Sequence, residues 1–133
     1  MITEDRFKHM IGVARECYRL AKEAGYTETF ARQMYMLGFI HDIGYEFSSD
    51  NHEEVGAEML KSARYSEYII ERHGKECPDF TITDYILNKA DMTIDGKGNK
   101  VTVEERLKDI EARYGKDSEQ YRSSLKMIEQ YSL

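Results

Sequence analysis

The sequence has few residues that break helices, cross membranes or cross-link the chain. It contains one proline, Pro78, and no tryptophan among its 133 residues. Its two cysteines, Cys17 and Cys77, form no CxxC or zinc-ribbon spacing, and two thiols in a chain of this size fit a reducing compartment. No apolar run approaches the roughly 18 residues of a membrane span, and the first ten residues include no secretory apolar region. We therefore expect a cytoplasmic protein that does not interact with a membrane.

The chain has fewer basic than acidic residues, 19 against 25, and this limits the molecules that it is expected to bind. The formal net charge is −6, whereas nucleic-acid binders gain most of their affinity from basic side chains that neutralise phosphates. A nucleic-acid duplex is therefore not expected as a partner. A small anionic substrate would have to be held by a metal ion or by a local basic cluster. Association of the chain with a second copy, as a homodimer, stays open.

Apolar residues at helical spacing occur along most of the chain, and no β-alternation of useful length is present. The expected helices span 3–24, 27–43, 52–63, 66–73, 81–91, 103–114 and 117–131. Capping boxes are expected at Thr81 with Asp84 and at Thr102 with Glu105, and Ser66 is expected to cap the fourth helix. Phe7, Tyr68, Ile82 and Leu125 are among the residues expected to face the core. The sequence predicts an all-α bundle of six or seven helices that forms a single domain over 1–133.

Residues 30–44 form the segment around which the rest of the chain is organised. Its only formal charges are Arg32 and Asp42, so we expect a helix covered by protein on nearly every side, with Gly44 as its stop. His41 and Asp42 are adjacent at the end of this helix. An ionised carboxylate in apolar surroundings is costly unless it is paired, hydrogen-bonded or bound to a cation. A metal ion would meet that need.

Four histidines and two aspartates make up the candidate ligand set. Each histidine is expected at a helix end or at the edge of a cleft, and the set is distributed over five expected helices. Its members are His9, His41, Asp42, His52, His73 and Asp91. Taken singly, these residues also have ordinary structural explanations, such as a partly exposed histidine or a helix cap. Together they suit one or two ions of Fe or Mn, or alternatively Co, Ni or Zn, better than Mg or Ca, which prefer oxygen ligands.

In their order and local sequence these residues resemble the HD-domain superfamily of metal-dependent phosphohydrolases, an all-helical family with the signature H…HD…D. His9 in RFKHMIGVA, the doublet His41 and Asp42 in LGFIHDIG, and Asp91 in LNKADMTID match that signature. Two further matches, to the extra histidines of the binuclear branch, are His52 in NHEEVGAEML and His73 in IIERHG. The resemblance covers roughly residues 9–106. It implies one ion held by the signature residues and a second held by His52 and His73, with Asp42 as the bridge.

The resemblance also implies an activity. Members of the HD-domain superfamily hydrolyse phosphate esters or anhydrides with a hydroxide formed from metal-bound water. The resemblance therefore implies that the substrate is a nucleotide, a dinucleotide or another small phosphate ester. His41, Asp42 and His73 would carry catalysis. The candidates for holding the phosphate are Arg6, Lys97, Lys100 and Arg106, of which the two lysines lie in the glycine-rich turn 95–100.

Two other functions remain open from the sequence. The first is a di-iron oxygenase, because a few enzymes of this fold activate oxygen and the same six ligands would serve. The second is a metal-binding module without catalysis. Its best argument is Tyr45, which occupies the position where many binuclear members carry a lysine.

Overall fold

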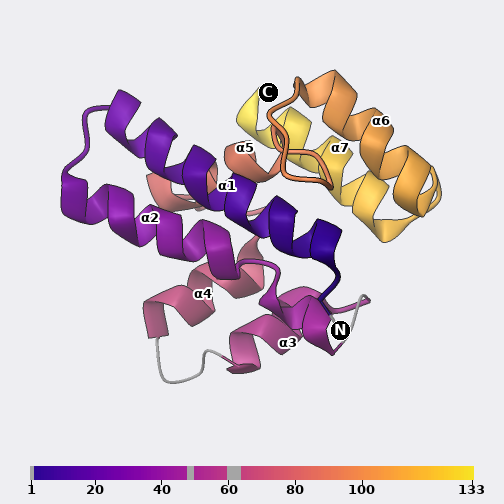
Figure 1. Ribbon diagram of the computed structural model, residues 1–133, viewed down its shortest axis with the longest axis horizontal. Coiled ribbons are helices and arrows are strands. Elements are labelled where there is room, and N and C mark those ends of the chain that lie inside the picture. Colours follow the sequence, from indigo (N-terminus) through magenta and orange to yellow (C-terminus); the bar gives the residue numbers. More distant parts are fainter. Residues whose placement is uncertain (1, 48–49, 60–63) are drawn as a thin grey trace.

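The computed structural model describes residues 2–47, 50–59 and 64–133. Within these ranges the chain forms seven α-helices and one short 3-10 helix (Figure 1). They are α1 Glu4–Glu23, α2 Glu28–Ile40, η1 Ile43–Glu46, α3 His52–Met59, α4 Arg64–Arg72, α5 Ile82–Asp91, α6 Val103–Tyr114 and α7 Glu119–Tyr131. The described ranges contain no strand, only an isolated bridge between Ile94 and Lys100, so the expected all-α fold is confirmed. None of the helices in these ranges is both long and apolar enough to cross a membrane.

Side-chain caps explain where most of the helices begin. The Thr27 side chain accepts a hydrogen bond at the start of α2, and both expected capping boxes are present, Thr81 with Asp84 at α5 and Thr102 with Glu105 at α6. Such a box satisfies two backbone N–H groups that would otherwise lack partners at the helix start. The local sequence therefore determines these boundaries.

Two expected boundaries differ in the structure, and a third cannot be compared. α4 begins at Arg64, so its backbone is already helical at Ser66, and Ser66 is not its cap. α2 ends at Ile40, and Gly44 lies inside η1 instead of stopping the longer helix. The expected end of the third helix, residues 60–63, lies outside the described residues.

The main hydrophobic core forms where α1, α2, α4 and α5 meet. Its buried residues are Val13, Cys17, Ala21, Ala31, Met34, Leu37, Ile69, Ile70, Ile86, Leu87, Ala90 and Ile94. α1 and α2 run side by side (Figure 1), and a Cβ atom at Gly38 would lie only 2.9 Å from the Ala14 Cα atom. Close packing of these two helices therefore depends on small residues at their contact.

One face of α2 is open to solvent, contrary to the expectation that protein covers it on nearly every side. Tyr35 and Met36 are 37% and 65% exposed, because α1, α4 and α5 pack against the other sides of the helix. Four further residues that were expected to face the core are also exposed: Phe7, Tyr68, Ile82 and Leu125. Apolar spacing identified the stripes but overestimated their width.

A second hydrophobic cluster supports the C-terminal helices. It consists of Met92, Ile110, Met127 and Tyr131 with partly buried neighbours. α6 and α7 form a hairpin that packs on α5 through this cluster, and in Figure 1 they lie on the side of the molecule away from α3 and α4. Asp109 on α6 accepts a hydrogen bond from the Gly96 N–H at 2.8 Å, which ties the hairpin to the turn 95–100.

We predict that Gly44→Ala destabilises the protein severely. A Cβ atom there would lie 2.6 Å from the carbonyl carbon of His52, closer still to its oxygen, and 2.8 Å from the Gly56 backbone nitrogen. Because these neighbours are backbone atoms, η1 and α3 would have to separate, and denaturant unfolding should show a loss of about 3 kcal/mol or more. The matched control is Gly56→Ala, whose Cβ would meet the Gly44 nitrogen at 3.3 Å. That variant should stay within about 1 kcal/mol of the wild type, and equal stability of the two variants would contradict the close contact.

Candidate metal centre

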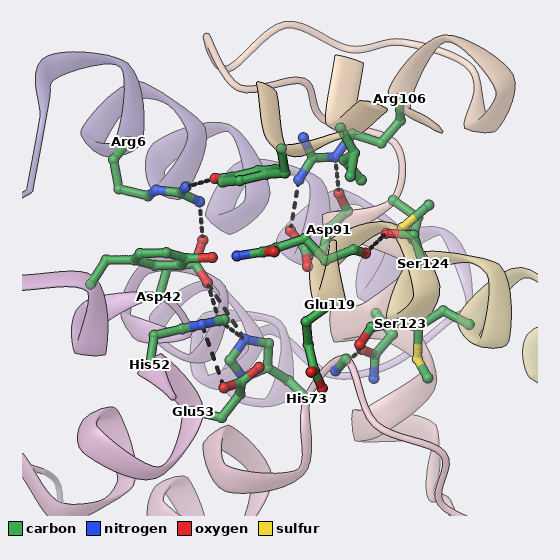
Figure 2. Close-up of a pocket in the computed structure, with 18 of the residues that line it drawn as sticks. Arg6, Asp42, His52, Glu53, His73, Asp91, Arg106, Glu119, Ser123 and Ser124 are labelled. Carbon is green, nitrogen blue, oxygen red and sulfur yellow. Dashed lines mark hydrogen bonds and ion pairs between the residues drawn. The ribbon is translucent and has the colours of Figure 1, made fainter. Parts of the chain in front are cut away.

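A pocket lies between the candidate ligands and the C-terminal hairpin (Figure 2). Asp42, His52, His73 and Asp91 line one side, and residues of α7, among them Ser123, line the other. The cavity volume is about 80 Å³. His9 and His41 lie behind this surface and are only 1% and 0% exposed, so His9 is more deeply buried than a position at a cleft edge would suggest.

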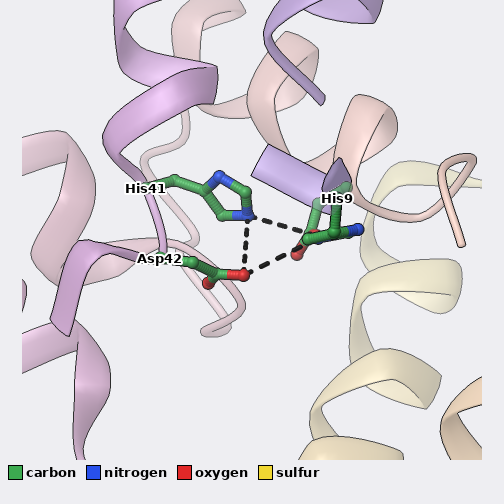
Figure 3. Close-up of side chains that lie close together, drawn as sticks. His9, His41 and Asp42 are labelled. Atoms are coloured by element: carbon green, nitrogen blue, oxygen red, sulfur yellow. Dashed lines mark hydrogen bonds and ion pairs between the residues drawn. The ribbon is translucent and has the colours of Figure 1, made fainter. Parts of the chain in front are cut away.

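Four of the candidate ligands form the first cluster, namely His9, His41, Asp42 and Asp91. Figure 3 shows His9, His41 and Asp42 pointing toward one another from α1, from the end of α2 and from the start of η1. His9 Nε2 lies 2.9 Å from Asp91 Oδ1, and His41 Nε2 lies 3.3 Å from both Asp42 Oδ2 and Asp91 Oδ1. One ligand atom from each residue lies within 4.8 Å of all the others.

The second cluster consists of Asp42, His52 and His73. The Nε2 atoms of the two histidines are 3.2 Å apart and lie 3.3 and 3.5 Å from Asp42 Oδ1. Asp42 thus presents Oδ2 to the first cluster and Oδ1 to the second. The structure brings all six candidate ligands together and places Asp42 between the two groups.

Hydrogen bonds on the far side of each imidazole favour one tautomer. Nδ1 of His9, His41 and His73 faces the backbone carbonyls of Asp95, Gly38 and Ile70 at 2.8, 2.6 and 2.6 Å. The remaining histidine, on α3, has the carboxylate of its neighbour Glu53 at 3.4 Å from Nδ1. With the proton on Nδ1, the Nε2 lone pair of each ring is available toward the cluster centre, as metal-binding histidines require.

Asp42 is buried and the Asp91 side chain is 22% exposed, and the surroundings of both carboxyls lower their pKa values. Burial alone would raise the pKa of each carboxyl, but His41 and the other facing histidines outweigh it and hold the pKa of Asp42 and of Asp91 well below the usual range. Burial lowers the pKa of His41, but the carboxylates of Asp42 and Asp91 outweigh this effect and raise the pKa to about 9. A proton on His41 and a divalent cation are therefore alternative ways to balance this negative charge.

Two arginines lie beside the clusters. Arg6 Nη1 donates to Asp42 Oδ2 at 2.9 Å, and the Arg6 guanidinium lies 3.9 Å from the centre of the Tyr45 ring. Arg106 donates through Nε to the Asp91 backbone carbonyl at 3.0 Å and pairs with Asp109 at 3.0 Å. Both of these expected phosphate-binding residues therefore line the pocket.

The other two expected phosphate-binding residues are not at the pocket. Lys97 and Lys100 line a separate surface groove along α1, and Lys100 forms an ion pair with Glu16. The turn that carries them is held on the outer side of α1, where Gly98 packs against the Lys8 backbone. The expectation that these two lysines share the site with the other candidates is therefore not met.

Several pocket residues were not predicted from the sequence. Tyr114, Glu119, Gln120 and Ser123 come from α6 and α7 and line the pocket, but no motif marks them. Glu53 is different, because it directly follows a candidate ligand in the sequence, and that adjacency was an available signal.

The fold and the two clusters define a helical protein with histidine and aspartate groups that could hold metal ions. Residues 6–95 match the family model of the HD domain, and the chain belongs to this family. Two curated relatives, named Ribonuclease Y, come from Dehalococcoides mccartyi strains BAV1 and CBDB1. Each is 32% identical to this chain over 90 residues, which cover 63% of this chain and 16% of the relative. The chain thus spans about a sixth of the length of these relatives, and no solved structure is significantly similar to it.

The donor set fits a divalent metal. Nε2 atoms and carboxylate oxygens converge from five elements, and without a shared proton or cation the two Nε2 lone pairs at 3.2 Å would repel each other. Imidazole and carboxylate donors suit several first-row metals and do not select one of them.

We predict that Asp42→Ala removes all bound metal, because both clusters lose a ligand. His52→Ala should lower the metal affinity of the second cluster only, by about 100-fold or more. Elemental analysis of protein purified with manganese or iron measures both effects, and circular dichroism checks the fold. The control is Asp79→Ala, which removes a carboxylate that is 75% exposed. Full metal occupancy in Asp42→Ala would contradict the bridging role.

Proposed function

We propose that this protein is a metal-dependent phosphohydrolase that acts on a small phosphorylated substrate, such as a nucleotide, a dinucleotide or another small phosphate ester. The observation that supports this most directly is the pair of donor clusters that share Asp42 at the wall of a pocket with two arginines. A bound divalent ion would supply Lewis acidity and lower the pKa of a coordinated water toward neutrality. The six ligands proposed to hold one or two such ions are His9, His41, Asp42, His52, His73 and Asp91.

The charge of the pocket supports a metal requirement for substrate binding. Five carboxylates and two arginines line it: Asp42, Asp50, Glu53, Asp91 and Glu119 against Arg6 and Arg106. A phosphate group brought into this surplus of negative charge would be repelled. Divalent cations at the clusters reverse the balance, so we propose that metal binds before substrate.

Tyr45 supports a role for Arg6. The Tyr45 ring stacks on the His52 ring with centroids 4.0 Å apart and an angle of 21° between the planes, and the Arg6 guanidinium lies against Tyr45. Arg6 Nη2 also donates to the Tyr114 hydroxyl. These contacts hold a fixed, delocalised cation beside Asp42, where a transferred phosphoryl group would gain charge. Tyr45 occupies the position of the lysine that the resemblance to the binuclear branch led us to expect, and it contributes to the site as the platform for Arg6.

Arg106 is better suited to orienting the Asp91 carboxylate than to contacting the substrate. Its Nε hydrogen bond to the Asp91 carbonyl joins α6 to the end of α5, and its pair with Asp109, one turn further along α6, fixes the guanidinium. Arg106 Nη2 lies 3.6 Å from Asp91 Oδ1. We propose that Arg106 orients the Asp91 carboxylate toward the first cluster and that Arg6 contacts the substrate.

The activity is tested with protein that has been stripped of metal and reloaded with manganese or iron. We expect phosphate release from a panel of nucleotides and sugar phosphates by the loaded protein and none by the stripped protein. Oxygen uptake in the same assays, without phosphate release, would favour the di-iron oxygenase. If the metal-loaded protein neither releases phosphate nor takes up oxygen, a metal-binding module without catalysis would be favoured.

We predict that Arg6→Gln lowers kcat/KM by about 100-fold, because it removes a positive charge beside the reacting phosphoryl group. Metal content should stay near the wild-type level, since all six candidate ligands remain. The control is Arg122→Gln, which changes an exposed arginine on α7 and should leave kcat/KM unchanged. A fall of less than about threefold in Arg6→Gln would remove Arg6 from the proposed mechanism.

A further inference from the structure

The wall that faces the candidate ligands is built from α7. This helix lies beyond residue 95, where the match to the HD domain ends. Glu119, Gln120 and Ser123 from its first turns line the pocket, and Figure 2 shows Glu119 and Ser123 across from His73. These three residues therefore face whatever part of a substrate projects away from the clusters.

The hairpin that carries the α7 wall is hydrogen-bonded to the rest of the molecule at two places. Near its end, Gln130 accepts from the Cys77 backbone N–H at 3.0 Å and donates to the Cys77 carbonyl at 2.7 Å. The neighbouring Tyr114 hydroxyl on α6 accepts from Arg6. The pocket is thus bounded by fixed walls on both sides.

The size of the pocket limits what it encloses. Its cavity of about 80 Å³ is small beside the roughly 300–1,000 Å³ of pockets that enclose drug-sized ligands. A phosphoryl group is small enough for a cavity of this volume, and the remainder of a phosphate ester would then lie at the open side of the pocket. The lining residues exposed to solvent are found on that side, and Asp50 and Glu119 are among them.

Carboxylates dominate the open side. Asp50 and Glu119 are exposed, while Glu53 is partly buried beside His52. None of the three belongs to either donor cluster, so metal binding at the clusters leaves their negative charge in place. Gln120 and Ser123 add neutral groups that can hydrogen-bond hydroxyl or amino groups.

From this arrangement, and resting on the proposed function, we infer that the substrate is a singly phosphorylated monoester of a small hydroxyl- or amino-bearing alcohol. Its phosphate faces the clusters, and Glu119 with Asp50 repels a second phosphate at the open side. Hydrolysis consumes water, breaks the bond between phosphorus and the ester oxygen, and yields the alcohol and inorganic phosphate. Polyanions such as RNA strands and dinucleotides are disfavoured, because each places a further phosphate near these carboxylates.

The test compares two probes that differ by a single distal phosphate, adenosine 5′-monophosphate and adenosine 3′,5′-bisphosphate. For manganese-loaded wild-type protein we expect kcat/KM to favour the monophosphate by about tenfold. Glu119→Gln should reduce this preference by about threefold or more, because KM for the bisphosphate falls by more than KM for the monophosphate. High salt should reduce the wild-type preference in the same direction, because screening weakens the repulsion.

The matched control is Glu129→Gln, the same substitution at an exposed position of α7 outside the pocket; it should leave the preference unchanged. Equal use of both probes by the wild type, or an unchanged preference in Glu119→Gln, would overturn the inference. Failure of the proposed function looks different, because neither probe would be hydrolysed. In that case equilibrium binding of both nucleotides to the manganese-loaded protein gives the same comparison, and absent or equal binding overturns the inference.

Discussion

The buried carboxylate of Asp42 is the constraint on which the rest of the structure depends. It is 3% exposed and ionised, so the fold has to surround it with partners. Arg6 pairs with Oδ2, His41 lies at the same oxygen, and His52 and His73 face Oδ1. These partners come from α1, α3 and the residues directly after α2 and α4, so neutralising one side chain fixes the relative positions of four segments. The same requirement explains why η1 and α3 pack so closely that Gly44 has no room for a side chain.

Much of the fold and most of the candidate site could be predicted from local sequence. Thr81, Thr102 and their box partners mark helix starts because the capping interaction lies within four residues. The candidate ligands could be found because histidines are few and because, apart from His9, each lies at or next to a helix end, where a side chain can reach a shared centre. The resemblance to a known signature then supplied their order, which composition alone could not.

The remaining features depend on contacts between distant segments. Spacing shows that α2 has an apolar stripe but not that its Tyr35 and Met36 face remains uncovered. Lys97 and Lys100 looked suitable because they are basic, but the packing of Gly98 on α1 decides which side of the helix they occupy. The same limitation applies to the α7 wall. Glu119 and Ser123 are ordinary helix-surface residues in the sequence, and only the docking of the hairpin on α5 brings them to the pocket.

The separate hydrophobic cluster beneath α6 and α7 divides the pocket into two structurally independent halves. The candidate ligands lie within residues 9–91 and depend on the main core. The C-terminal hairpin rests on its own small core and presents polar side chains to the pocket. The shape and charge of this wall can therefore be altered at Glu119, Gln120 or Ser123 without disturbing the packing that brings the histidines and aspartates together.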